Sequence, residues 1–427
     1  MIRERRPPAR PSRVAARVRE EVGPDAVRLE EGVVVAAPGG TGDASVLIGL
    51  AAVEGWRLAP AGAGLGPAGP ATRGADRPHP DLVLSSERMT GPLDHRPGDF
   101  NVAVGAGVTL DALASRLAPE GQWLALDPPG GGGVTVGGVV ADGRAGPLGA
   151  LFGRPRDLLL GLTVVDGAGR ILRLGGRVVK NVAGFDLVRL VAGSRGGLGM
   201  ITEATFRLHP LPAADLTLVW GCADALEAWE LGRRLAPLRV PVAAAEVVAG
   251  EWPEPLGAGP PRLLLRLMGS AAASRQIVRL LEAEAGKPDE EWKGGASAAR
   301  FRALSEGEGL GSGGGGAFRA HALPARGGEL LSAFSGVACR RIALGLLGGT
   351  CRGYPSDGEA ARAARVAAER IEASFAEPGD GWARVPGGSG RSPRARLASR
   401  IVAGFDPSGI LPGAWRKGRA RSSGREG

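Results

Sequence analysis

The stretch from Leu172 to His209, LRLGGRVVKNVAGFDLVRLVAGSRGGLGMITEATFRLH, constrains the fold of this chain more than any other. It predicts a short strand, a polar turn at Lys180 and Asn181, a helix, a glycine-rich loop and a closing strand. Glycine-rich backbone between a helix and a buried strand lets a large flat or phosphorylated ligand approach the main chain. The stretch therefore predicts one wall of a ligand site.

Upstream of this wall the sequence predicts a β-α-β unit, with buried strands over residues 33–38 and 56–60. Asp43 is expected to cap the connecting helix, which Gly55 ends. The apolar residues on one face of this helix are expected to face the core: Val46, Leu47, Leu50 and Val53. Such a unit predicts two parallel strands.

A glycine-rich loop, PAGAGLG, follows the second of these strands over residues 60–66. Its glycines at 64, 66 and 69 match the spacing of a dinucleotide fingerprint, but that motif must open a helix. Four prolines, at 67, 70, 78 and 80, exclude such a helix and with it a Rossmann fold. Two interpretations remain open, a phosphate-binding nest of backbone N–H groups and a plain flexible loop.

The chain changes character after Pro212, where strands and helices alternate up to about residue 374. The order of these elements suits an antiparallel sheet with helices on one side. At 427 residues a chain is expected to form two or three domains, which agrees with this change.

Positive charge is concentrated at the two ends of the chain. The formal net charge is +9, but residues 1–20 carry +5, residues 384–427 carry +8, and the remainder carries −4. A basic tail can contact RNA, anionic lipid or an acidic partner, or it can simply be solvated. Aromatic residues make up only 4% of the chain, too few for the stacking platforms of single-stranded nucleic-acid binding, so no nucleic-acid partner is expected.

Three cysteines, Cys222, Cys339 and Cys351, are far apart and form no CxxC motif. This spacing supports neither a disulfide framework nor a metal or iron–sulfur site. No apolar run approaches the roughly 20 residues of a membrane span, and the arginine-rich N-terminus has no apolar signal core. A cytoplasmic location is therefore expected, with attachment at the inner face of the plasma membrane open through a complex.

Several motifs in a fixed order resemble the FAD-binding flavoproteins of the vanillyl-alcohol-oxidase type, also called the PCMH type. The motifs are PAGAG (60–64), VGAGVTLDAL (104–113), DPPG (127–130), VGGVVA (136–141), RDLLLGLTVVDGAG (156–169), GSRGGLGMITEATFRLHPLP (193–212) and FDPSGILPG (405–413). Within this group KNVAGFDLVRL (180–190) is most similar to FAD-binding subunits of bacterial glycolate oxidases, with Phe185 in place of an expected tyrosine.

The resemblance implies an α+β fold, a PCMH-type FAD-binding domain of two α/β subdomains followed by a cap domain of an antiparallel sheet and helices. The expected division is a basic tail (1–28), the FAD-binding domain (29–212), the cap (213–375), a linker (376–396), a C-terminal segment returning to the FAD domain (397–415) and a basic tail (416–427).

The resemblance also implies which residues hold the cofactor. Those expected to wrap the FAD pyrophosphate are Ala61, Gly62, Ala63, Gly64 and Leu65. Those expected along the isoalloxazine, the ribityl chain and the adjoining walls are Pro128, Pro129, Gly137, Gly138, Ala141, Gly146, Gly199 and Ile201. Ala61, Ala63 and Leu65 provide neither the histidine nor the cysteine of a covalent flavin link, so non-covalent FAD is expected.

Oxidation of a 2-hydroxy acid by a flavin requires a base for the hydroxyl proton and a cation for the carboxylate. The related catalytic subunits carry an HGDGN-like motif that this sequence lacks, and His79, His95, His209 and His321 are isolated, with His321 the one weak candidate. No catalytic residue and no metal ligand is assigned.

Three interpretations of the whole chain follow. The first is the FAD-binding subunit of a glycolate oxidase complex that includes a catalytic flavoprotein subunit and an iron–sulfur subunit. The second is a self-sufficient FAD-dependent 2-hydroxy-acid dehydrogenase, and the third is a flavin-free assembly subunit.

Overall fold

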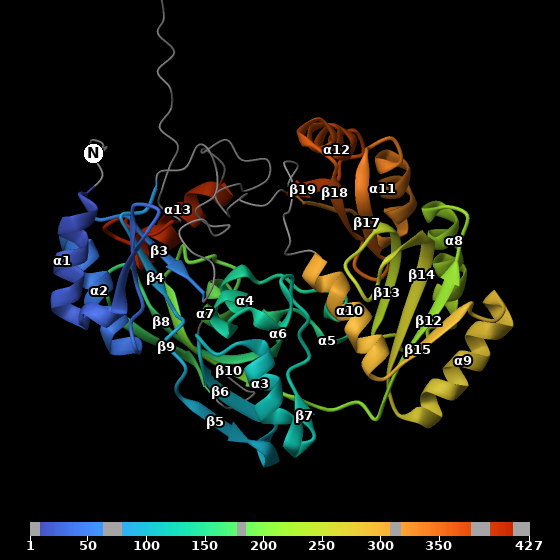
Figure 1. The fold of residues 1–427 in the computed structure, drawn as a ribbon, viewed down its shortest axis with the longest axis horizontal. Helices are drawn as coiled ribbons and strands as arrows, with labels where there is room; N and C mark the ends of the chain where they lie inside the picture. Colours follow the sequence, from blue (N-terminus) through green and yellow to red (C-terminus); the bar gives the residue numbers. More distant parts are fainter. Residues whose placement is uncertain (1–8, 63–78, 177–184, 308–316, 377–392, 413–427) are drawn as a thin grey trace, which may run out of the picture.

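The protein was analysed as a computed structural model that describes residues 9–62, 79–176, 185–307, 317–376 and 393–412. Two smaller sheets with their helices form one half of the molecule, and one large sheet with its helices forms the other (Figure 1).

The first sheet is the β-α-β unit that the sequence predicts, extended by two strands. Its strands, in spatial order, are β1 (Val27–Glu30), β2 (Val33–Ala36), β4 (Leu82–Ser85) and β3 (Leu58–Ala61). β2 and β3 are both parallel to β4, which lies between them, while β1 is antiparallel to β2. Helices α1 (Pro11–Val22) and α2 (Thr41–Glu54) cover this sheet with buried apolar residues.

The second sheet is antiparallel throughout. Its strands, in spatial order, are β5 (Leu93–Arg96), β6 (Asn101–Gly105), β10 (Met200–Arg207), β8 (Leu159–Val165) and β9 (Ile171–Gly175). The predicted hairpin is therefore present as β8 and β9. The helices beside this sheet are α3 (Leu110–Leu117), α4 (Val136–Asp142), α5 (Gly149–Phe152), α6 (Pro155–Leu158) and α7 (Leu187–Val191).

The cap is a single antiparallel sheet of eight strands. Their spatial order is β15 (Glu290–Lys293), β12 (Ala214–Gly221), β14 (Ala258–Gly269), β13 (Ala244–Glu251), β17 (Cys339–Gly345), β18 (Thr350–Pro355), β16 (Phe318–His321) and β19 (Ser374–Ala376). The short pair β7 (Gln122–Trp123) and β11 (His209–Pro210) lies where the chain leaves the first half for the cap.

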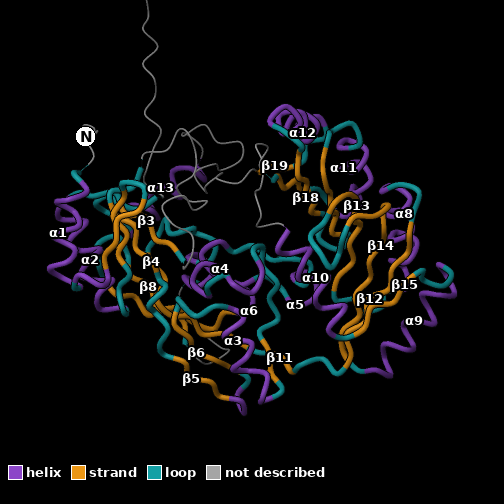
Figure 2. The backbone as a smooth tube through the Cα atoms, in the orientation of Figure 1, coloured by secondary structure: helices purple, strands orange, loops and turns teal. Residues whose placement is uncertain are grey.

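Helices cover the two faces of the cap sheet differently (Figure 2). The outer face packs against α8 (Ala225–Leu235), α9 (Ala271–Ala285), α11 (Gly327–Phe334) and α12 (Gly358–Arg370). The inner face, toward the first half of the molecule, is covered by α10 (Gly295–Gly307), which the sequence did not predict. The cap thus meets the FAD-binding half through α10 and the inner face.

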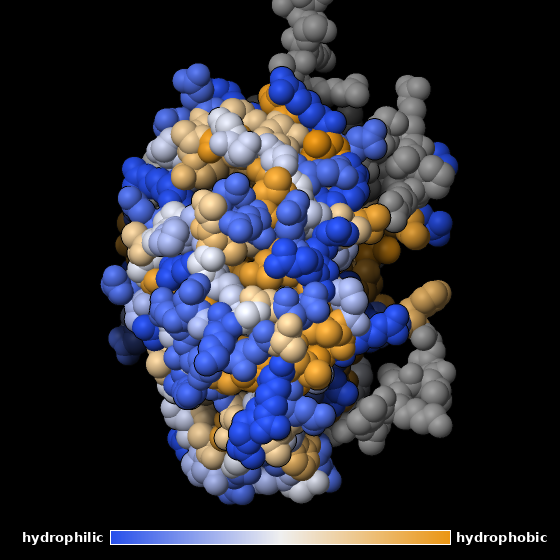
Figure 3. All heavy atoms as spheres, turned by 90° about the vertical axis from the view of Figure 1, so that its right-hand side faces the viewer, coloured by the Kyte–Doolittle hydropathy of each residue, from blue (hydrophilic) through white to orange (hydrophobic). Residues whose placement is uncertain are grey.

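The outer side of the cap is mostly hydrophilic, and its apolar residues form small separate groups (Figure 3). Leu226, Leu280 and Val366 are exposed on α8, α9 and α12, while the opposite sides of these helices are buried. These helices therefore have one solvent-facing side and one core-facing side.

The chain returns from the cap to the first half through α13 (Pro393–Phe405) and residues 406–412. Ile401, Val402 and Phe405 pack on the core of the second sheet, while Ile410 and Leu411 are buried in the core of the first. The C-terminal segment therefore contacts both sheets.

A buried carboxylate fixes this return. Asp406 accepts hydrogen bonds from the N–H groups of Ile410 (3.0 Å) and Leu411 (2.9 Å), and it is 3% exposed. The Gly167 N–H donates to Phe405 O (2.8 Å), and the Leu58 N–H donates to Ile410 O (2.9 Å). The turn is thus tied to a strand end of each sheet.

The N-terminal region differs from the predicted basic tail over residues 1–28. Residues 11–22 form α1, in which Val14 and Val18 are fully buried, and β1 begins at Val27. Arginines dominate the composition of this region, but the apolar residues fall on one side of the helix and Arg13 reaches Glu54 of α2 (3.0 Å). The boundary of the tail at residue 28, which was predicted from charge content alone, was therefore wrong.

The core face of α2 also differs from the prediction. Val46 and Val53 are 48% and 84% exposed, and the buried residues are Ala44, Leu47, Ile48 and Ala51. The helix begins at Thr41, so Asp43 is inside its first turn, where it accepts from the Gly39 N–H (2.9 Å). Because α2 is apolar on every side, spacing alone could not identify the face that packs.

We expect Asp406→Asn to destabilise the fold by about 1–3 kcal/mol, because an amide has one oxygen for the two buried N–H groups that the carboxylate serves. Urea unfolding of the variant against wild type measures the change. An unchanged midpoint would show that the return turn is held by other contacts.

The cost of this substitution should depend on pH. The pKa of Asp406 is raised, chiefly by burial and also by the negative charge of Asp166. Hydrogen bonds from the N–H groups of residues 409–411 lower this pKa but do not cancel the increase. Between the unfolded and the folded pKa the native state binds more protons than the unfolded state, so the contribution of Asp406 to stability falls as pH rises. Asp406→Asn should therefore cost more below the unfolded pKa than at pH 7.

Candidate cofactor site

Three segments that are distant in sequence meet beside α4. A Cβ built on Gly146 would lie 2.0 Å from Asp127 O, and the Leu148 N–H donates to Asp127 Oδ2 (2.9 Å). The Gly193 N–H donates to Val140 O (2.9 Å). Residues 127–129, 137–146 and 193–201 therefore form one continuous surface, which we call the cofactor wall.

The first sheet reaches the same wall through the end of β3. A Cβ on Gly62 would lie 2.5 Å from Thr135 Oγ1 and 3.8 Å from Gly138 Cα. Gly196, with φ +76°, is in contact with Pro60. Of the residues predicted to wrap the pyrophosphate, Ala61 and Gly62 thus lie against the wall, whereas Ala63, Gly64 and Leu65 lie outside the described residues, as does Lys180.

The glycines of the wall are required for two different reasons. At Gly137, Gly146 and Gly199 a Cβ would meet protein atoms at 2.7 Å (Ala106 Cβ), 2.0 Å (Asp127 O) and 2.4 Å (Val165 O). At Gly138, apart from chain neighbours and the helix's own backbone, the only atom of the described residues within 4 Å of such a Cβ is Thr135 Oγ1, at 3.1 Å. Packing of the described residues therefore explains the first three glycines, while Gly138 leaves space that a ligand can use.

The backbone N–H groups at the start of α4 are already engaged. The N–H of Val136 donates to Val108 O and that of Gly137 to Ala106 O, both at 2.8 Å. The Gly138 N–H reaches Thr135 Oγ1 (3.3 Å). The amides of Gly137 and Gly138 are therefore already paired within the protein and are not free to bind a cofactor.

Two buried hydroxyls next to the wall lack partners among the described residues. Ser86 Oγ and Ser194 Oγ belong to residues that are 3% and 6% exposed. Ser86 is linked to β3 through its N–H, which donates to Ala61 O (3.0 Å), and Ser194 precedes Arg195 of the wall. Buried polar groups are nearly always paired, so both hydroxyls fit a ligand that supplies hydrogen-bonding atoms. Serine is too common for the sequence to have identified them.

Positive charge is built into the wall. Asp142 accepts from Arg144 Nε and from Arg195 Nε (3.2 Å), which gives the cluster one excess positive charge. Arg195 has φ +50°, and its N–H donates to Ala141 O (2.8 Å), so the loop holds this residue in place. An anionic diphosphate is the kind of ligand that such a surface favours.

Pro128, Pro129 and Ile201, predicted to line the isoalloxazine, the ribityl chain and the adjoining walls, are buried, and Ala141 is half-buried. Next to them, the cap closes on the wall. The Gly130 N–H donates to Ser305 O of α10 (3.2 Å), and Arg302 of α10 pairs with Asp111 of α3 (3.1 Å). The region predicted for the isoalloxazine therefore lies at the junction between wall and cap.

The histidines do not form a catalytic group. His79 is exposed, His95 contacts Gln122 Oε1 (2.9 Å) and His321 contacts Thr350 Oγ1 (3.3 Å) at an exposed strand end. His209 packs on Phe152, and burial followed by the charge of Arg207 lowers its pKa. In the described residues no group of histidine, cysteine and acidic side chains could hold a metal ion.

The cysteine thiols are poor nucleophiles. Burial raises the pKa of Cys339 to about 11 and raises that of the fully buried Cys351 further. The pKa of Cys222 is also raised, mainly by burial and to a smaller extent by the negative charge of Glu227. Thiolates are the reactive form, so these side chains are inert at neutral pH.

Comparison with known proteins agrees with this geometry. Residues 33–175 match a protein-family model described as an FAD binding domain. The glycolate oxidase subunit GlcE of Escherichia coli (strain K12) is 40% identical over 143 residues, which are 33% of this chain and 41% of that protein. A D-2-hydroxyglutarate dehydrogenase of Xanthomonas citri pv. viticola is 32% identical over 188 residues, 44% of this chain and 39% of that protein.

The chain thus spans about two fifths of the length of these curated relatives. A solved structure of alkyldihydroxyacetonephosphate synthase is 14% identical, with a TM-score of 0.70 over 96% of this chain and 86% of that one. The predicted α+β fold with an antiparallel-sheet cap is confirmed, and residues 33–175 are similar to FAD-binding domains.

We expect Gly138→Leu to abolish FAD retention while the fold is kept, because leucine suits a helix and its side chain would fill the space beside Thr135. FAD content of the purified variant, together with circular dichroism and Tm, measures both effects.

Two further glycines serve as controls. Gly133→Leu should retain FAD, since nothing lies within 4 Å of its Cβ, and Gly137→Leu should lower Tm through its clash with Ala106. Normal FAD content in folded Gly138→Leu would refute the placement of the cofactor.

Proposed function

We propose that this chain is the FAD-binding subunit of a complex that oxidises glycolate, or a close 2-hydroxy acid, to the corresponding 2-oxo acid. The observation that carries the proposal is the 40% identity to the glycolate oxidase subunit GlcE over 143 residues. Similarity to a D-2-hydroxyglutarate dehydrogenase over 188 residues supports the substrate class.

FAD, when bound, accepts the hydride equivalent from the carbon that bears the hydroxyl group. The residues proposed to hold it are those of the wall and the end of β3, with the hydroxyls of Ser86 and Ser194 as hydrogen-bonding groups. The cap contacts the wall through α10, where the Gly130 N–H donates to Ser305 O. Ala61 and the other residues of the loop offer no covalent anchor, so the FAD is proposed to be non-covalent.

The oxidation also needs a base for the hydroxyl proton. In the parts of the chain that the structure describes, each histidine lies outside the wall or is occupied in packing. We therefore assign the base to a catalytic flavoprotein subunit of the same complex. Electrons would leave through an iron–sulfur subunit, because the three cysteines of this chain are dispersed over residues 222–351.

The location that fits this assignment is the cytoplasm, with the complex able to hold the chain at the inner face of the plasma membrane. Over the described ranges, no helix combines the length and apolarity needed to cross a bilayer.

A self-sufficient dehydrogenase is the second candidate, favoured by the similarity to a D-2-hydroxyglutarate dehydrogenase. A flavin-free assembly subunit is the third. One experiment separates the three functions. The chain is purified alone, its visible spectrum is recorded without oxygen, and glycolate is added, followed by the candidate catalytic subunit.

We expect flavin bands that persist with glycolate and bleach only after the partner is added. Bleaching by glycolate alone would contradict the subunit function and support a self-sufficient dehydrogenase. A colourless chain that also fails to bind added FAD would support the flavin-free assembly subunit and contradict the other two functions.

Non-covalent attachment gives a simple prediction. Precipitation with trichloroacetic acid should leave a colourless pellet and release the flavin into the supernatant, because unfolding removes the only interactions that hold it. Yellow protein after washing the pellet would demonstrate a covalent bond and contradict the proposed attachment.

A further inference from the structure

One arginine of the cap points from the inner face toward the FAD-binding half. Arg266 lies on β14 and is 5% exposed. Its cross-strand neighbour is Ala244, which belongs to the apolar cluster of the inner face beneath α10. A nearly buried guanidinium at this junction is unusual, because charged groups are costly to bury unless they are paired.

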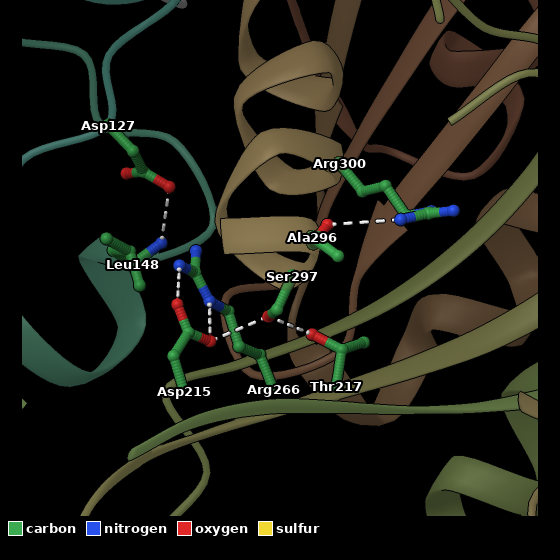
Figure 4. Close-up of polar contacts among 8 residues, drawn as sticks. All are labelled: Asp127, Leu148, Asp215, Thr217, Arg266, Ala296, Ser297 and Arg300. Atoms are coloured by element: carbon green, nitrogen blue, oxygen red, sulfur yellow. Dashed lines mark hydrogen bonds and ion pairs between the residues drawn. The ribbon is translucent and has the colours of Figure 1, made fainter. Parts of the chain in front are cut away.

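The guanidinium of Arg266 is held in one orientation. Asp215 Oδ1 accepts from Nε (2.9 Å) and Oδ2 accepts from Nη2 (2.6 Å), which is a bidentate pair. Ser297 Oγ donates to Asp215 Oδ1 (2.6 Å) and lies 2.7 Å from Thr217 Oγ1 (Figure 4). The ring of Phe301 covers one face of the guanidinium, with its centroid 4.9 Å from Cζ.

The remaining nitrogen of this guanidinium is unused. Within the described residues, Nη1 of Arg266 donates no hydrogen bond, although Nε and Nη2 are both satisfied. Figure 4 shows the guanidinium on the side of the cap that faces Leu148 and Asp127 of the FAD-binding half. Asp127 directly precedes Pro128 of the cofactor wall, and α5, which follows Leu148, packs against β13.

We propose that Arg266 is the group that binds the carboxylate of the 2-hydroxy acid, through Nη1, with Asp215 and Ser297 as positioning residues. This inference rests on the proposed function, and it places the 2-hydroxy acid between the wall and the cap. A fixed, nearly desolvated guanidinium donor with an unfilled position suits a carboxylate oxygen, because charge-assisted hydrogen bonds are the strong ones.

Asp215 also sets the strength of this site. It already neutralises the charge of Arg266, so the carboxylate gains hydrogen bonds from a neutral pair and little net Coulomb attraction. Binding on the order of millimolar is therefore expected, as suits a substrate that must leave after oxidation.

The other buried ion pair of the inner face does not offer the same position. Glu246 and Arg352 are 3% and 5% exposed and bind each other directly. Glu246 lies on β13 opposite Gly345 of β17, and Glu246 and Arg352 each have a further interaction besides this pair. Arg266 combines burial, a fixed orientation and an Nη1 atom that donates no hydrogen bond within the described residues.

Titration calorimetry of the whole chain with glycolate and with glycolamide tests the proposal. Glycolamide keeps the hydroxyl group and the size of glycolate but has no charge, so wild type should bind it at least about tenfold more weakly. Equal affinities would overturn the proposal without the need for any variant.

The matched variants are Arg266→Lys and Arg300→Ala. Lysine keeps the positive charge, but its single ammonium group cannot form a bidentate pair with Asp215 and also donate to the substrate carboxylate. Glycolate binding should therefore weaken at least about tenfold. Arg300 is on the neighbouring α10, but its guanidinium stacks on Trp292 (4.6 Å) and Nη1 reaches Ala296 O (3.3 Å), so its loss should leave binding unchanged.

Unchanged glycolate affinity in folded Arg266→Lys would show that Arg266 is only structural. If that variant does not fold, as judged by circular dichroism and Tm, the comparison with glycolamide decides. FAD content is measured on every sample. A flavin-free wild type that binds glycolate through Arg266 would contradict the proposed function alone, and a flavin-bound wild type that binds no glycolate would contradict this inference alone.

Discussion

The FAD-binding half of the molecule depends on a contact that joins its two sheets. Asp406 holds a tight turn whose apolar residues enter the core of the first sheet, while α13 before it packs on the second. The cofactor wall is built from both sheets, because Gly62 of the first sheet meets Thr135 and Gly138 beside the second. The geometry of the site therefore depends on residues more than 250 positions later in the chain.

The cofactor wall shows that a glycine-rich motif can combine two physical requirements. Gly137, Gly146 and Gly199 are needed because neighbouring backbone or side chains occupy the place of a Cβ. At Gly138 the described residues place only Thr135 Oγ1 in that direction, and the buried hydroxyls of Ser86 and Ser194 are available nearby. The same short segments thus close the protein core and, in the proposed site, face the cofactor.

Much of this architecture could be predicted from sequence, because motif order and alternation report directly on the β-α-β unit, the hairpin and the antiparallel cap. Burial was harder to predict. Arginines concealed the apolar side of α1, and α2 is so uniformly apolar that Val53 was expected in the core. In the site, Ser86 and Arg266 could not be selected, because the missing partner of the Ser86 hydroxyl and the fixed orientation of the Arg266 guanidinium are properties of three-dimensional packing.

The late arrival of the C-terminal segment has a consequence for biosynthesis. During translation, the first two sheets leave the ribosome long before residues 401–411, which are separated from them by the entire cap. The apolar surfaces that Phe405 and Leu411 will cover stay open throughout that interval, so this half cannot mature strictly from its N-terminus onward. This half therefore completes its core only after residues 401–411 have been synthesised.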